Sequence, residues 1–276
     1  MIDYDELMKK LKESKPQINK NTIDKKEINH YVDKVRRTLL QLKLNDDNLD
    51  NNLSNIQIEK IDAPTDKIKY KLDDGSKNMS SVYDNKHNRL SISSLNDIIH
   101  ELFHISSSNR ETSGIILNRE FYAMNEGITD MLTNMTDSNY LIKYPMEEAC
   151  ASIFILLFGN EILEGYTKHS FDIFINKIPF KSRAIVINFL RKLDEFENLY
   201  LKYLNEQKLP NSLFGLFENL ITTLFRLCYK DNQKMDQVEQ LLKSKFNSFA
   251  FSILFDKMDL KNFDCEYYKN SQSYQR

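Results

Sequence analysis

Two histidines and a glutamate occur close together in the segment His100-Glu101-Leu102-Phe103-His104. If this segment is helical, positions four apart lie about 40° from one another around the helix, so His100 and His104 project from one face. Two imidazoles at that spacing can bind one Zn²⁺ ion. Glu101 lies one position further round, where it can reach a water molecule on the metal but is badly placed as a third ligand. We therefore expect a zinc site in which Glu101 acts as a general base.

A catalytic zinc site needs a third protein ligand and keeps a fourth position open for water. The best candidate is Glu126, in a segment with a helical pattern over residues 121–132. Asp130 lies four positions after Glu126 on the same helix face, so its carboxylate could accept the free ring N–H of a ligating histidine. Asn125 could do the same for the other histidine through its side-chain oxygen. The sequence thus contains a second motif, Asn-Glu-x-x-x-Asp, that could complete the site.

Together the two motifs resemble the gluzincins, the thermolysin-like family of zinc metallopeptidases. The resemblance covers residues 82–135 and does not extend to the segments on either side. It implies a zincin-like catalytic core with one zinc ion per chain and a peptide or protein as substrate. It also implies a role for each matched residue: His100, His104 and Glu126 as zinc ligands, Glu101 as the base that activates water, and Asn125 and Asp130 as supports for the ligands.

Three interpretations of the motifs belong to different classes of function. The first is a zinc metallopeptidase that hydrolyses peptide bonds through a zinc-bound water activated by Glu101. The second is a regulatory or binding protein that keeps the zincin fold and serves a single dedicated partner or has no turnover. The third is a helical interaction module in which His100 and His104 line a polar helix face and bind no metal. We adopt the first, because the second motif follows the first at a plausible distance.

Residues just before the first motif predict where its helix begins and what surrounds it. Ser94-Leu95-Asn96-Asp97 is a capping-box pattern, so we expect the helix to start near Leu95. Apolar residues recur at helical spacing and would bury the opposite face, namely Ile98, Leu102 and Ile105. In the second segment, the small residues Ala123 and Gly127 could let that helix pack closely against the first.

A hairpin is expected immediately upstream, with alternating residues over 81–84 and 89–93 and a turn over 84–88. In zincin folds the edge strand of such a sheet pairs with an extended substrate, and pairing with an edge strand is a general way to hold a peptide. An ordinary hairpin packed on the helix is the equally acceptable alternative.

The donor that would stabilise the developing negative charge on a peptide carbonyl is not identified by the motifs. His169 follows the second motif along the chain, which suits such a role. Tyr140 and Tyr144 follow the second helix more closely. The sequence leaves these three residues as alternatives.

The composition, with 41% hydrophobic and 28% charged residues, is that of a soluble globular protein. A net charge of −2 does not indicate nucleic acid or an anionic membrane surface as a partner. Three cysteines, Cys150, Cys228 and Cys265, are widely separated, which argues for a reducing compartment. We expect the first two to lie in the core. The acidic N-terminus lacks an apolar signal segment and no apolar run is long enough to span a membrane, so we expect a cytoplasmic location.

The expected fold class is α+β, mostly α, with a small β-sheet before the active-site helix. Three segments are predicted: an N-terminal helical segment over residues 1–52, a zincin-like catalytic core over 53–136, and a helical C-terminal subdomain over 137–276. The oligomeric state is left open.

Hydrophobic periodicity predicts the remaining elements. An amphipathic helix is expected over about 24–44, followed by a polar break at 45–52 that we interpret as a surface loop. Strands are expected over 56–61 and 68–72, with a turn at 73–76. The helices predicted in the C-terminal part cover residues 147–158, 181–206, 211–229 and 234–255.

Overall fold

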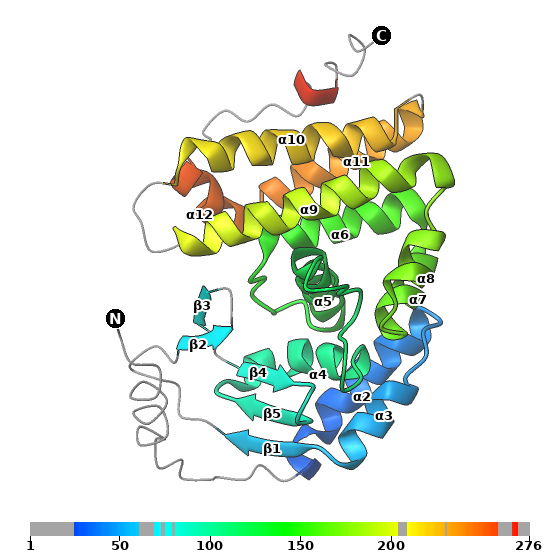
Figure 1. Cartoon of the computed structure of the whole chain (residues 1–276), viewed down its shortest axis with the longest axis vertical. Helices are drawn as coiled ribbons and strands as arrows, with labels where there is room; N and C mark the ends of the chain where they lie inside the picture. Colours follow the sequence, from blue (N-terminus) through cyan, green and yellow to red (C-terminus); the bar gives the residue numbers. More distant parts are fainter. Residues whose placement is uncertain are drawn as a thin grey trace.

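The computed structural model describes residues 25–60, 69–72, 75–78, 81–203, 209–229, 231–258 and 267–269. Within these ranges the chain is mostly helical, with one three-stranded sheet and one two-stranded hairpin (Figure 1). The predicted class, α+β and mostly α, is therefore confirmed. The helical prediction for residues 1–24 lies outside the described residues.

The N-terminal part forms two helices that lie beside the sheet and helix α4 (Ile98–Ser106). Helix α2 (Lys25–Gln41) occupies most of the predicted range, and its apolar stripe is buried as expected, for example Val35 and Leu39 at 0% exposure. Helix α3 (Asp47–Ser54) was not predicted, and the expectation of a surface loop over 45–52 was wrong.

Helix α3 forms despite its polar sequence because its side chains have specific partners. Leu49 is fully buried. The Asn48 side-chain amide donates to the Thr167 carbonyl oxygen at 2.7 Å. The Asn52 amide donates to the carbonyl oxygens of Ile105 and Ser108, both at 2.8 Å. These contacts are made with segments distant in sequence, so local propensity, which favours loops for Asn and Asp, did not reveal the helix.

The three-stranded sheet has the order β1–β5–β4. Strand β1 (Gln57–Lys60) pairs in parallel with β5 (Arg89–Ile92), which pairs antiparallel with β4 (Ser81–Asp84), so the predicted hairpin is confirmed. Among the described strands, β4 has a neighbour on one side only. A separate hairpin consists of β2 (Lys69–Leu72) and β3 (Gly75–Asn78). Residues 75 and 76 of the predicted turn at 73–76 belong to β3, and its first two positions lie outside the described residues.

Two helices follow the sheet and carry the motifs. The Ser94 side chain accepts from the Asn96 backbone N–H at 3.2 Å and caps a short 3₁₀ helix, η1 (Leu95–Asp97). Helix α4 (Ile98–Ser106) continues from it, close to the predicted start. Helix α5 (Tyr122–Thr136) contains the second motif. It has α4 and the sheet on one side and the group of C-terminal helices on the other (Figure 1).

The C-terminal part is helical, as predicted, and one long prediction divides into two helices. The expected helix at 234–255 is interrupted after Phe246. Three short helices between residues 160 and 176 were not predicted. The elements are α6 (Pro145–Phe158), η2 (Asn160–Ile162), α7 (Leu163–Thr167), α8 (Phe171–Asn176), α9 (Phe180–Lys202), α10 (Asn211–Leu227), α11 (Asn232–Phe246) and α12 (Phe249–Met258).

One contiguous apolar core includes residues of all three segments. Cys150 and Cys228 are buried in it, as predicted. No helix within the described ranges combines the length and the apolar character that crossing a membrane requires.

At Gly127, helix α5 approaches a neighbouring helix closely, and that neighbour is α6. A Cβ atom built at Gly127 would lie 2.2 Å from the backbone oxygen of Glu147. The expectation that this small residue lets α5 pack against α4 is therefore corrected: the space that it provides is filled by the α6 backbone.

Candidate metal centre

The first motif lies on α4, which is buried along nearly its whole length. His100 is 3% exposed and the His104 side chain 14% exposed. The apolar face that the sequence predicted is fully buried, with 0% exposure for Ile98, Leu102 and Ile105. Packing of this face fixes the rotation of α4 about its axis and therefore the direction in which the two histidines project.

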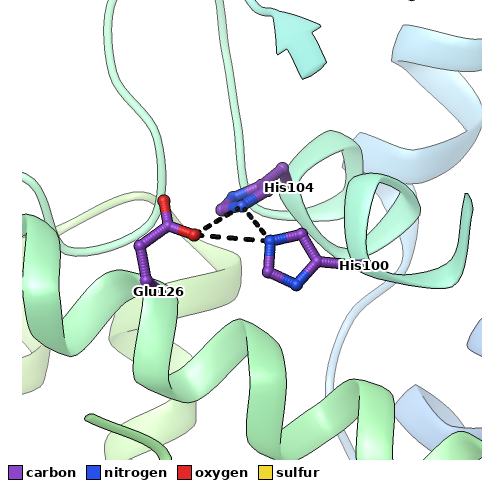
Figure 2. Close-up of side chains that lie close together, drawn as sticks. All are labelled: His100, His104 and Glu126. Carbon is purple, nitrogen blue, oxygen red and sulfur yellow. Dashed lines mark hydrogen bonds and ion pairs between the residues drawn. The ribbon is translucent and has the colours of Figure 1, made fainter. Parts of the chain in front are cut away.

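The two histidines face Glu126, which projects towards them from α5 (Figure 2). The Nε2 atoms of His100 and His104 are 3.1 Å apart. The Glu126 Oε2 atom lies 3.3 Å from the first and 3.4 Å from the second. Tetrahedral zinc with bonds of about 2.0–2.1 Å requires ligand atoms about 3.3–3.4 Å apart. The three side chains thus fit a zinc ion, with the spacing of three corners of a coordination tetrahedron.

Asp130 fixes the orientation of His100 from the other side of the ring. Its Oδ1 atom lies 2.8 Å from the His100 Nδ1. Asp130 is fully buried and accepts three further hydrogen bonds: from the Tyr140 hydroxyl at 2.7 Å, and from the backbone N–H groups of Lys143 and Tyr144, both at 2.8 Å. A proton held on Nδ1 leaves the Nε2 lone pair of neutral His100 directed towards Glu126, as metal binding requires.

Charges in this cluster are strongly coupled. Burial lowers the pKa of His100, but hydrogen bonds to Asp130 and Glu126 outweigh it and raise that pKa to about 10. Burial raises the pKa of Glu126, but His104 and His100 outweigh it and hold that pKa well below its usual range. Without metal, His100 is therefore an imidazolium beside a carboxylate. A metal ion that binds there replaces a proton, so its affinity falls as the pH is lowered.

Glu101, the residue expected to act as the general base, is nearly enclosed by the protein and has hydrogen-bonding capacity that no described residue uses. The residue is 5% exposed. Within the described part of the chain, its carboxylate takes part in no hydrogen bond or ion pair. A carboxylate can only accept hydrogen bonds, and the Glu101 oxygens are not among the fully buried side-chain atoms of the described chain that lack a partner, so water can reach them. A water molecule or a substrate N–H at the metal site would supply a donor.

Asn125 makes a different contact from the one expected. Its Oδ1 atom accepts from the Ile115 backbone N–H at 3.2 Å, and among the described residues it bonds to neither histidine. Gly114, with φ +55°, makes room, since a Cβ there would lie 1.7 Å from this oxygen. The amide is thus used to hold the connection between α4 and α5, which places Glu126 relative to the histidines.

The structure shows where each of the three candidates for the oxyanion donor lies. His169 lies at the α7–α8 junction, with its Nδ1 3.4 Å from the Asn48 side-chain amide on α3. The Tyr140 hydroxyl binds Asp130 and lies 3.2 Å from His100 Nδ1, on the side of the ring opposite to Nε2. The Tyr144 ring centroid is 6.3 Å from that of His100. Burial, with a smaller contribution from Glu126, raises the Tyr144 pKa well above its usual value, which keeps its hydroxyl protonated. The Tyr140 ring centroid lies equally close to that of His100, at 6.2 Å, so both tyrosines stay candidates for the role.

Two contributors to the site were not found from the sequence. One is the Tyr140 hydroxyl in its role as a partner of Asp130. The other is Asp194, on α9, which accepts hydrogen bonds from the first turn of α5. Neither residue belongs to a motif, and Asp194 is far from the second motif along the chain.

A comparison with known proteins found no matching family model, no matching curated protein and no matching solved structure.

We predict that replacement of Asp130 weakens zinc binding. The variant Asp130→Asn loses one oxygen acceptor and presents an NH₂ group to donors, so His100 is no longer held by a carboxylate. The expected loss is about 10–100-fold in zinc affinity, measured by competition with a chromogenic chelator. Tyr140→Phe, which removes one of the hydrogen bonds to Asp130, should cause a smaller loss. Wild-type affinity in Asp130→Asn would contradict the role of this carboxylate.

Proposed function

We propose that this protein is a zinc-dependent metallopeptidase. The observation that carries the proposal is the spacing of the His100, His104 and Glu126 ligand atoms, which lie 3.1–3.4 Å from one another. The resemblance of the two motifs to those of gluzincins, which rests on the same residues, agrees with it. The unpartnered carboxylate of Glu101, on the same helix as the histidines, supplies the base that hydrolysis requires.

The proposed chemistry divides between the metal and the side chains. A zinc ion in such a site polarises a carbonyl group and lowers the pKa of water. Glu101 accepts a proton from the attacking water molecule, whose oxygen forms a bond to the peptide carbonyl carbon. As the C–N bond breaks, Glu101 returns the proton to the leaving amine. Asp130 holds the His100 ring in place throughout.

Strand β4 supports an extended peptide as the substrate. In the described sheet it is an edge strand, and it packs beside α4, which carries the first motif (Figure 1). Its free backbone groups can add one further strand. A peptide bound in this way would run past the ligand-bearing helix, so its scissile bond would lie near the metal.

Metal analysis tests the first requirement of the proposal. Protein purified without chelator or nickel should contain about one zinc ion per chain, and His104→Ala should lose it. Because zinc binds the folded chain, its removal should lower the melting temperature; at a free zinc concentration 100-fold above Kd the stabilisation is about 2.7 kcal/mol. Mass spectrometry and thermal unfolding with and without chelator measure these effects. Protein that contains no zinc and takes up none at neutral pH would refute the proposal.

A further inference from the structure

Helix α5, which carries Glu126, begins without a capping side chain of its own. Its N-cap residue is Phe121, with φ 73°, and Phe121 provides no side-chain hydrogen bond to the helix. A bulky residue in this left-handed region is strained, and the first turn of any helix has backbone N–H groups without partners inside the helix. Some other part of the molecule must therefore hold the start of α5.

Asp194, on α9, holds the start of α5 through two hydrogen bonds. Its Oδ2 atom accepts from the Phe121 N–H at 2.5 Å, and its Oδ1 atom accepts from the Ala123 N–H at 2.9 Å. A carboxylate in this position satisfies two donors and interacts favourably with the helix dipole. One turn earlier on α9, Arg191 forms two hydrogen bonds with Glu120, at 3.2 and 3.3 Å. Thus α9 binds the residues on both sides of the strained Phe121.

The ligands depend on these contacts unequally. His100 and His104 lie on α4, which packs against α2, α3 and β4 as well as against α5. Glu126 lies about one turn into α5, just beyond the two N–H groups that Asp194 binds. A shift or fraying of the first turn of α5 would therefore move Glu126 directly, whereas it would act on the histidines only through the packing of α5 against α4, which α2, α3 and β4 also hold.

We infer that Asp194 is a positioning residue of the metal centre: it holds the first turn of α5 so that Glu126 stays at ligand distance from the two histidines. The inference rests on the proposed function, since it assumes that these three residues bind zinc. It also assigns a role to the C-terminal helices, because α9 then contributes to metal binding without providing a ligand.

A double-mutant cycle on the full-length chain tests this coupling, with zinc affinity measured by competition with a chromogenic chelator. Asp194→Ala should weaken zinc binding about 10-fold. In the Glu126→Ala background, where the third ligand is already absent, Asp194→Ala should have no further effect. Asp194→Asn, which keeps one oxygen acceptor, should fall between Ala and wild type, and it serves as the test if Asp194→Ala does not fold.

Asp231 provides the matched control. It caps α11 by accepting from the Lys234 N–H at 3.1 Å, and α11 carries no ligand. Asp231→Ala should lower the melting temperature as Asp194→Ala does, yet leave zinc affinity unchanged. Equal zinc affinity in Asp194→Ala and wild type, or an equal loss with and without Glu126, would overturn the inference alone. A wild-type chain that binds no zinc would overturn the proposed function as well.

Discussion

Replacing Glu101 by glutamine is expected to leave zinc bound and to lower the rate of peptide hydrolysis by about 10²–10⁴-fold. Glutamine preserves the size and shape of the side chain but cannot accept a proton from water. The ligands His100, His104 and Glu126 are unchanged, so zinc content and melting temperature should stay at wild-type values. Hydrolysis of a quenched-fluorescent peptide library and metal analysis of the same preparation measure the two effects.

The control for this experiment is Glu111→Gln, because Glu111 is an exposed glutamate in the connection that follows α4. Both variants remove one negative charge close to α4, so a general electrostatic effect should appear in both. Cleavage at the wild-type rate by Glu101→Gln would exclude the proposed role of this carboxylate. Bound zinc without cleavage of any library peptide by the wild-type chain would contradict a general peptidase.

Gly127→Ala is expected to destabilise the fold by about 3 kcal/mol, although alanine is the better helix former by about 1 kcal/mol. The new Cβ would meet two backbone atoms of Glu147, its oxygen at 2.2 Å and its carbonyl carbon at 2.5 Å. Backbone atoms cannot move aside as a flexible side chain can, so α5 and α6 must separate. Since α5 carries Glu126 and Asp130, zinc affinity should fall together with the free energy of unfolding, measured by chemical denaturation.

Gly215→Ala gives the matched control for the loss of a helical glycine. Gly215 lies in α10, and a Cβ there would have no neighbouring atom within 4 Å. This substitution should stabilise the protein by about 0.5–1 kcal/mol through helix propensity alone. If Gly127→Ala were as stable as wild type, the close approach of α5 to α6 would be wrong.

The parts of the fold that the sequence predicted are those that local periodicity determines. The stripe of α2, the hairpin of β4 and β5, and the start of α4 all follow from residues within a few positions of one another. The same holds for the common face of His100 and His104, which needs only helical geometry. Helix α3 was missed because its Asn and Asp residues favour loops, and its stabilising partners lie on α4 and α7.

The parts that could not be predicted depend on which elements meet. Gly127 indicated a close approach, but a small residue does not reveal which helix fills the space, and the neighbour is α6 rather than α4. Asn125 is an amide with several possible partners, and its contact with Ile115 depends on the path of the intervening chain. The Asp194 contacts join residues 71 and 73 positions apart, far beyond the range of any local pattern.

The three candidate ligands also have consequences for metal selectivity. Two imidazole nitrogens and one carboxylate oxygen provide too few oxygen donors for Mg²⁺ or Ca²⁺. Cu²⁺ binds such donors more tightly than Zn²⁺, so affinity alone cannot exclude copper. Geometry could disfavour it, because three ligand atoms in a square-planar Cu²⁺ site with bonds of about 2.0 Å include two pairs about 2.8 Å apart and one pair about 4 Å apart. The three atoms here are nearly equally spaced, at 3.1–3.4 Å. His100, held by a buried carboxylate that itself receives four hydrogen bonds, resists a shift to the square-planar spacing, and the fold would thereby discriminate between two abundant transition metals.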